Sequence, residues 1–150
     1  MIKLKVVYIT IEDISSGLFS SQVLAPLMKM AEIDSERAFE IIIFNRPWKY
    51  FDHRRTLKTL RKSVLLKNIS IRYIPLLPPL RNVTKSKFLS RSVTYFISFL
   101  LLILTDKNKT IYHSRSYWPC ASGLLINLKP MIFEPRSLWN LENIEMGSII

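Results

Sequence analysis

The stretch His113–Asn143, HSRSYWPCASGLLINLKPMIFEPRSLWNLEN, decides the fold. A short strand pattern ends at His113, an apolar helical pattern covers Pro119–Leu128, and a second strand pattern covers Met131–Phe133. A strand, a helix and a second strand in this order indicate two parallel strands. Parallel strands need a long crossover connection such as a helix, whereas antiparallel neighbours need only a short hairpin. Charged residues follow both strands, and such strand ends line the ligand crevice of open α/β sheets. The stretch therefore predicts a parallel sheet with an edge polar enough to bind a sugar.

The same alternation of strands and helices extends back to the N-terminus. Strand patterns occupy Leu4–Thr10, Phe39–Phe44, Ile69–Ile74 and Thr110–His113, and helical patterns begin at Ser20, His53 and Lys87. Alternation of this kind predicts a three-layer α/β/α Rossmann-like domain, with right-handed crossovers and helices on both faces of the sheet. The expected strand order is 3-2-1-4-5, which places the loops 12–17 and 113–118 beside one crevice. At 150 residues, the chain has the length of a single domain.

Composition excludes several classes of protein. A hydrophobic content of 49% is too high for a disordered chain. Cys120 is the only cysteine, which favours a reducing compartment such as the cytoplasm, and the N-terminus lacks the apolar core of a signal peptide. The apolar segment Tyr95–Leu104 has about half of the ~20 residues that a spanning helix needs. We expect it to be a buried helix, with an interfacial membrane contact as the alternative.

The positive charge is concentrated in the middle of the chain. The net charge is +11, and the segment Arg46–Arg91 alone holds 13 Lys and Arg against a single acid, Asp52. Such a zone is suited to phosphates of nucleic acid, anionic lipid or nucleotide sugars, although a merely solvated face is the alternative. Aromatic residues are not interleaved with the basic stripe formed by the residues named next, and no known nucleic-acid-binding motif appears, which argues against nucleic acid. The expected membrane or phosphate contacts are Arg54, Arg55, Lys58, Arg61 and Lys62.

Two loops supply candidate binding residues. Ser16 and Gly17 stand between the first strand and the first helix, where backbone N–H groups can hold an anion or a sugar oxygen. His113 and Arg115 follow the fourth strand, and they could transfer a proton and bind a phosphate or carboxylate, respectively. The alternatives are a plain loop glycine and a structural histidine.

The fifth strand ends in Glu134, Pro135 and Arg136. The carboxylate of Glu134 could act as a general base towards a sugar hydroxyl, or anchor that hydroxyl by hydrogen bonding. The alternative is an ion pair of Glu134 with Arg136 or Arg115 that only orders the loop. Metal-ligand, serine-hydrolase, phosphate-loop and dinucleotide motifs are missing from the sequence, so no metal and no cofactor is expected.

Four segments together resemble the N-terminal domain of a family 4 glycosyltransferase of the GT-B fold. They are KVVYITIEDISSG, SSQVLAPLMKMA, IYHSRSY and MIFEPRSLWNLEN. The last is similar to the family's FDxRG segment with a Glu five residues further on, but Glu134 replaces the usual Asp and Ser137 stands where Gly is common.

The resemblance implies an acceptor-binding domain that faces a second, donor-binding domain. Glu134 and His113 would be catalytic, and Ser16, Gly17, Arg115 and Arg136 would bind substrate. The donor-domain signature is missing from these residues, so the expectation is a truncated half-enzyme, inactive alone, with an incomplete C-terminal end. Its partners would be a glycan or lipid-linked sugar acceptor and an anionic membrane surface, with nucleotide sugar bound only through the second domain. The alternative function is a non-catalytic basic module that binds nucleic acid or another anionic ligand.

Overall fold

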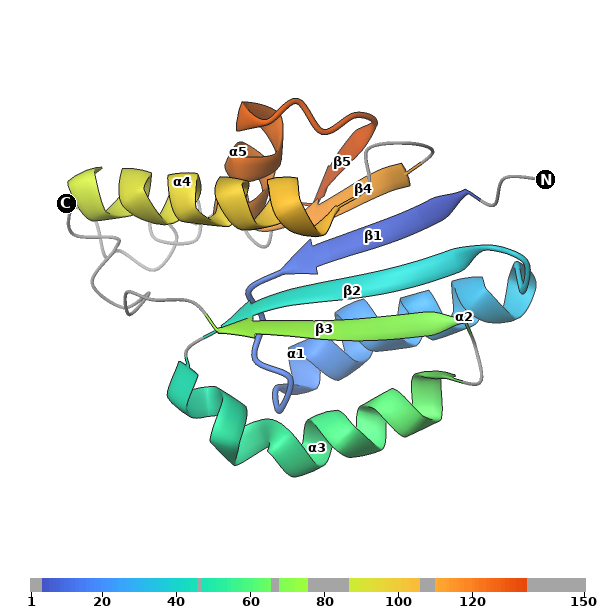
Figure 1. The fold of residues 1–150 in the computed structure, drawn as a ribbon. Coiled ribbons are helices and arrows are strands. Elements are labelled where there is room, and N and C mark those ends of the chain that lie inside the picture. The colour runs from blue at the N-terminus through green and yellow to red at the C-terminus, as the bar shows by residue number, and fades with distance from the viewer. Residues whose placement is uncertain (1–3, 46, 66–67, 76–86, 106–109, 135–150) are drawn as a thin grey trace, which may run out of the picture.

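A computed structural model describes residues 4–45, 47–65, 68–75, 87–105 and 110–134. Within them, five strands form one parallel sheet in the order β3-β2-β1-β4-β5, which confirms the predicted topology (Figure 1). The strands are β1 (Lys5–Thr10), β2 (Ala38–Asn45), β3 (Ile69–Pro75), β4 (Thr110–Arg115) and β5 (Met131–Glu134).

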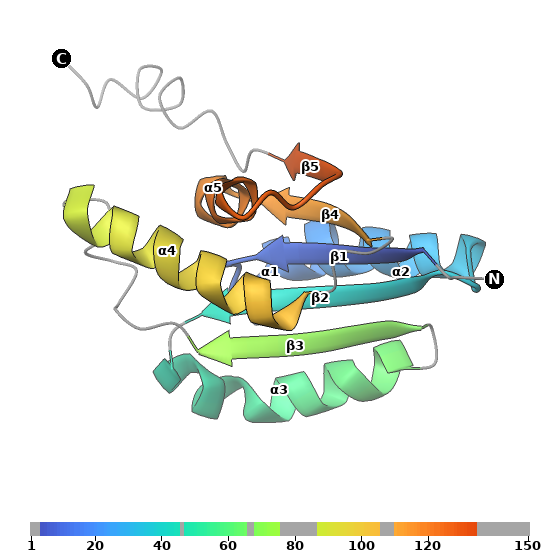
Figure 2. The same cartoon turned by 45° about the horizontal axis from the view of Figure 1, so that its top comes forward.

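Helices cover both faces of the sheet, so the predicted three layers are present (Figure 2). One face is covered by α3 (Pro47–Leu65) and by a continuous helical segment, which consists of α1 (Gly17–Phe19), the π-helical η1 (Ser20–Leu24) and α2 (Ala25–Ile33). The other face is covered by α4 (Lys87–Leu104) and α5 (Tyr117–Leu125). Successive residues of β2 alternate between the two cores: Ile41 and Ile43 join one, and Ile42 and Phe44 join the other. This is why the central strands are apolar without interruption.

The first helical segment starts earlier than its apolar pattern indicates. Ser16 caps it, because its Oγ accepts a hydrogen bond from the N–H of Phe19 at 3.0 Å. Pro26 lies beyond the first turn of this helical segment, and it has no N–H to donate to the preceding turn. The wider π-helical turn η1 directly precedes Pro26, which is how the helix accommodates it.

Two other helices, α3 and α5, have boundaries that differ from the expected ones. α3 begins at Pro47 rather than His53, because proline is favoured in the first helical position, where its missing N–H costs nothing. α5 begins at Tyr117 rather than Pro119 and ends at Leu125 rather than Leu128. Asn127 stops it with a left-handed φ of 58°.

The segment Tyr95–Leu104 is helical as expected, but only one side of it is buried. Val93, Ile97 and Leu101 pack against the sheet, whereas Tyr95 and Phe99 are exposed on the outer side. No helix in the described part of the chain is both long and apolar enough to cross a membrane.

Candidate functional site

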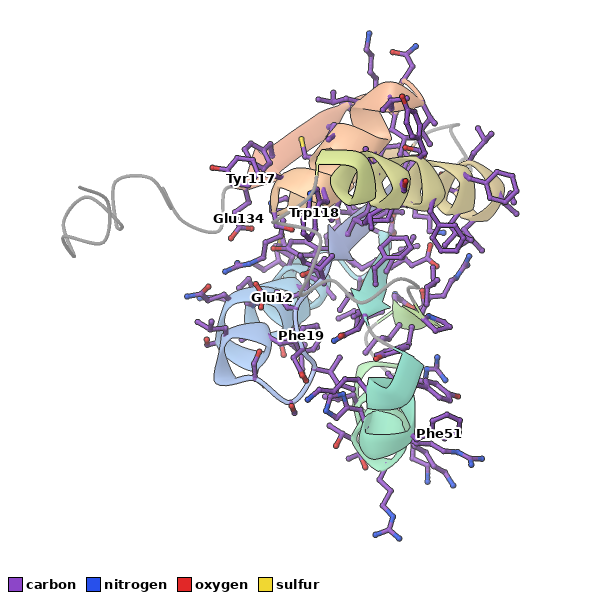
Figure 3. The ribbon with its side chains drawn as sticks, turned by 90° about the vertical axis from the view of Figure 1, so that its left-hand side faces the viewer. Glu12, Phe19, Phe51, Tyr117, Trp118 and Glu134 are labelled. Carbon is purple, nitrogen blue, oxygen red and sulfur yellow. The ribbon has the colours of Figure 1, made fainter. Side chains whose placement is uncertain are left out.

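The carboxyl ends of β1, β4 and β5 bring several polar side chains to one edge of the sheet. β1 pairs with β4, and β4 pairs with β5, with Arg115 opposite Glu134 in the register. Figure 3 faces this edge and shows Glu12 and Glu134 on it. This is the edge at which ligands bind in open α/β sheets, since the chain leaves β1 and β4 in different directions here.

Glu134 is the centre of the site. Its Oε2 accepts a hydrogen bond from the hydroxyl of Tyr8 at 2.7 Å and lies 3.2 Å from Nε2 of His113. Its Oε1 accepts from Nη1 of Arg115 at 2.5 Å. The side chain is nevertheless 36% exposed, so the carboxylate remains open to solvent and to a ligand.

Arg115 is the buried cation beneath this carboxylate. Its side chain is only 4% exposed, and its Nε lies 3.5 Å from Oε1 of Glu12, which is 3% exposed. It also donates a hydrogen bond to Oε1 of Gln22 in η1. A guanidinium keeps its charge under these conditions and holds carboxylates through several N–H groups at once. Arg115 therefore connects β4 to β5, to the loop after β1 and to the helix that follows that loop.

Burial sets the protonation states of the two aromatic partners of Glu134. It lowers the pKa of His113, and the charge of Arg115 adds to this effect, whereas the charge of Glu134 opposes it without reversing it. His113 is therefore neutral at pH 7. Burial and the hydrogen bond to Glu134 raise the pKa of Tyr8, so its hydroxyl stays protonated and donates. The two rings meet edge to face with centroids 4.5 Å apart.

The structure brings together three of the residues that the sequence singled out: Glu134, His113 and Arg115. The Glu134–Arg115 ion pair weighed as an alternative is present. Ser16 caps α1 and Gly17 begins it, and no contact joins either of them to Glu134 among the described residues. Arg136 lies outside the described residues.

Sequence reasoning missed Tyr8, Glu12 and Gln22. Tyr8 belongs to an apolar strand, and nothing in the sequence of that strand indicates that its hydroxyl, rather than only its ring, makes a specific contact. Glu12 could have been found, because it is a carboxylate two residues after the end of β1 and hence at the same edge. Gln22 comes from a helix, so only the three-dimensional structure reveals its contact with Arg115.

A second polar cluster joins the loop after β1 to α3. Asp13 lies 3.2 Å from Nζ of Lys49 and 3.3 Å from Nε2 of His53, and it accepts hydrogen bonds from the side chain and backbone of Ser15. Burial tends to raise the pKa of Asp13, but the bonds from Ser15 and Lys49 and the charge of His53 outweigh it and hold that pKa low. The cluster fixes the loop that leads into the crevice.

The outer face of α3 carries the expected basic stripe. Leu57 is buried against the sheet, and Arg61 donates from Nε to the carbonyl oxygen of Ile71 at 3.1 Å.

Exposed Phe51 lies one turn before Arg55 and projects from the outer side of α3 (Figure 3). An aromatic residue therefore flanks the basic stripe, although none was expected there from the sequence. A groove of about 730 Å³ is lined by Tyr50, Arg54, Arg55, Leu57, Lys58, Arg61 and Lys62.

The fold defines the class of protein: a three-layer α/β domain of Rossmann-like topology. Comparison with protein-family models, curated proteins and solved structures finds no match to this chain. Among the described residues, no group of three or more His, Cys, Asp or Glu side chains is placed to hold a metal ion. The site itself must therefore supply the argument for function.

Proposed function

We propose that this chain is the acceptor-binding part of a glycosyltransferase, working in the cytoplasm or on the inner face of the membrane. The observation that carries the proposal is the partly exposed carboxylate of Glu134, held by Tyr8, His113 and Arg115 at the carboxyl edge of the sheet. The resemblance of four segments to family 4 glycosyltransferases supports the same reading, and the strand order is compatible with it.

The hydrogen bonds of Glu134 suit it to hold a sugar hydroxyl. Each carboxylate oxygen can accept about two hydrogen bonds. Among the described side chains, Oε2 has two neighbouring donors, Tyr8 and His113, whereas Oε1 has Arg115. Oε1 can therefore accept a further hydrogen bond from a ligand. In the proposed reaction it receives the proton of the acceptor hydroxyl as that oxygen bonds to the sugar carbon of the donor, while the bond from that carbon to the nucleotide phosphate breaks and the nucleotide leaves on the second domain.

Charge also favours a neutral ligand. Arg115 faces the two carboxylates of Glu12 and Glu134, and His113 is neutral at pH 7. The described residues of this cluster thus carry one positive and two negative charges, which disfavours an anionic group directly on Glu134. A sugar hydroxyl can donate to the carboxylate without bringing charge into the site.

Binding of simple glycosides to the full 150-residue chain tests the proposal. The probes are methyl α-glucopyranoside, methyl β-galactopyranoside and N-acetylglucosamine, titrated against the ¹⁵N-labelled chain and followed by NMR. At least one probe should shift the amide signals of residues around Glu134, and Glu134→Gln should weaken that binding about tenfold, as expected for a lost bond to a charged group. The matched control is Glu36→Gln, which removes the same charge from an exposed position.

Two results would overturn the proposal. One is the absence of any shift at this edge with all three glycosides. The other is equal affinity of the wild type and Glu134→Gln for a glycoside that does bind, because the carboxylate would then be a structural ion-pair partner only.

A second function, contact with an anionic surface, is favoured by the groove on α3. Its basic side chains are exposed on one face of the helix, and a basic residue near an anionic membrane contributes about 1 kcal/mol. Phe51, at the end of the same face, could enter the interfacial region of a bilayer. We propose that this face contacts the phosphates of a membrane that contains anionic lipid.

Vesicle flotation measures this contact. Vesicles with phosphatidylglycerol should carry the chain upward, pure phosphatidylcholine vesicles should not, and added salt should reduce the effect. Lys58→Gln/Lys62→Gln should weaken flotation more than Lys29→Gln/Lys129→Gln, a pair that removes the same charge from exposed positions elsewhere. If the chain instead binds single-stranded RNA with salt-sensitive affinity and ignores anionic vesicles, the membrane contact is wrong and nucleic-acid binding replaces it.

A further inference from the structure

Ser116 joins β4 to α5 in a backbone conformation that side chains rarely adopt. Its φ is 82° and its ψ is 160°, a region occupied almost only by glycine. Its N–H donates to the carbonyl oxygen of Glu134 at 3.2 Å, and its own carbonyl oxygen accepts from the N–H of Cys120 at 3.4 Å. Neighbours on both sides therefore hold this residue in place, at the edge where Glu134 lies.

The hydroxyl of Ser116 is buried and makes no hydrogen bond with any residue that the structure describes. The residue is 7% exposed. A serine at the start of a helix usually accepts a hydrogen bond from an N–H in the first turn, as Ser16 does for Phe19. Ser116 makes no such bond to α5, a nine-residue helix. A buried hydroxyl without a partner is unfavourable, so a strained serine at this place points to a ligand.

The charges near Ser116 indicate which group its hydroxyl would bind. Arg115, the preceding residue, is already balanced by Glu12 and Glu134. The first turn of α5 contributes only a partial positive charge, about half of a unit. Among the residues that the structure describes, a phosphate would therefore meet two carboxylates and no side-chain cation that is not already paired with them. A neutral hydroxyl fits better, because it can donate to one group and accept from another.

We propose that Ser116 is a further binding residue, and that its hydroxyl hydrogen-bonds a neutral hydroxyl of the sugar at the N-terminus of α5. This inference rests on the proposed function and deepens it: it adds a second contact to the one at Glu134 and selects neutral sugars over phosphorylated ones. Glycine could adopt this backbone conformation without strain, so a binding role of the hydroxyl explains why a serine stands at this position.

The test uses Ser116→Ala and Ser116→Gly in the full chain, with the same three glycosides and the same NMR titration. Both variants should weaken glycoside binding about tenfold. Neither should unfold at a lower temperature, because Ser116→Ala removes an unbonded buried hydroxyl and Ser116→Gly also relieves the strained φ.

The matched control is Ser122→Ala in the same helix. Its hydroxyl is also buried, but it donates to the carbonyl oxygen of Thr94 at 3.0 Å and so connects α5 to α4. Ser122→Ala should lower the unfolding temperature and leave glycoside affinity unchanged. The opposite behaviour of these two serines separates a binding role from a structural role.

The outcomes distinguish this inference from the proposed function. If Glu134→Gln weakens glycoside binding but both Ser116 variants bind normally, Ser116 is not a contact and only this inference fails. If no glycoside shifts any signal at this edge, both proposals fail. Inorganic phosphate that binds the wild type more tightly than the glycosides, and loses affinity in Ser116→Ala, would overturn the assignment to a neutral ligand.

Discussion

Arg115 and Glu134 stand opposite each other in the register of β4 and β5 and form an ion pair, with 2.5 Å between Nη1 and Oε1. Because Arg115 also lies 3.5 Å from Glu12, the guanidinium connects two adjacent strands to the loop after a third. The same contact that orders the edge of the sheet thus positions the carboxylate proposed to bind substrate.

Replacement of Arg115 by Met should destabilise the fold by about 3–5 kcal/mol, since it leaves Glu12 charged in a buried place. The free energy of unfolding in urea measures this. Arg54→Met, at an exposed position on α3, should cost much less. Glu12→Gln/Arg115→Met should recover part of the loss, because the buried charge is then gone. If Arg115→Met lowers the free energy of unfolding no more than Arg54→Met does, the pairing of Arg115 with Glu12 contributes little to stability.

Replacement of Tyr8 by Phe should cost about 1–2 kcal/mol of stability, because a buried hydroxyl no longer donates to the carboxylate of Glu134. The partial exposure of Glu134 limits the loss, since water can replace the missing donor there. Urea denaturation again provides the measurement. Tyr95→Phe, which removes an exposed hydroxyl from α4, should change nothing measurable. Equal effects of the two substitutions would contradict the role assigned to Tyr8.

Stability should fall as the pH drops below about 6.5, in part because of His113. Its pKa in the folded chain is below the ordinary value of 6.5, so the unfolded chain binds a proton that the folded chain does not. The loss begins near pH 6.5 and continues down to the folded pKa. His113→Gln should flatten this part of the stability profile. A profile of His113→Gln as steep as the wild type would exclude this histidine as the cause.

The fold could be predicted from the sequence because its strands are buried on both faces. β1 and β2 are continuous apolar runs, and the helices between the strands leave only the parallel arrangement. Helix boundaries were less predictable, because they depend on single residues. Pro47 starts α3 and Asn127 stops α5, and neither effect appears in the periodicity of apolar residues.

Only part of the site could be predicted in the same way. The topology places every strand end at one edge, so Glu134, His113 and Arg115 were found from position alone. The side-chain partners depend on distances that a pattern does not contain. Tyr8 was hidden in a core strand, and the unbonded hydroxyl of Ser116 has meaning only when its φ is known.

Glu40 offers a test of buried charge away from the site. Its side chain is 2% exposed on β2 and pairs with Lys5 at 2.7 Å and Arg72 at 2.8 Å, both of which reach solvent. Glu40→Leu should change stability by only about 1 kcal/mol, because the two cations can hydrate and an apolar side chain suits the buried position. Lys5→Met/Arg72→Met should cost about 3–5 kcal/mol, because it leaves the carboxylate buried without either cation.

The stability losses of Glu40→Leu and of Lys5→Met/Arg72→Met are compared by rank rather than by size, because the energies of single interactions vary with context. Arg72 also donates to the carbonyl oxygen of Leu104 at the end of α4, so the single variant Arg72→Met reports how much of the double-variant loss comes from that bond. After this correction, urea denaturation should still rank the double variant well below Glu40→Leu. If Glu40→Leu proves the more damaging change, the carboxylate is a net stabilising group, and desolvation is not the dominant cost at this position.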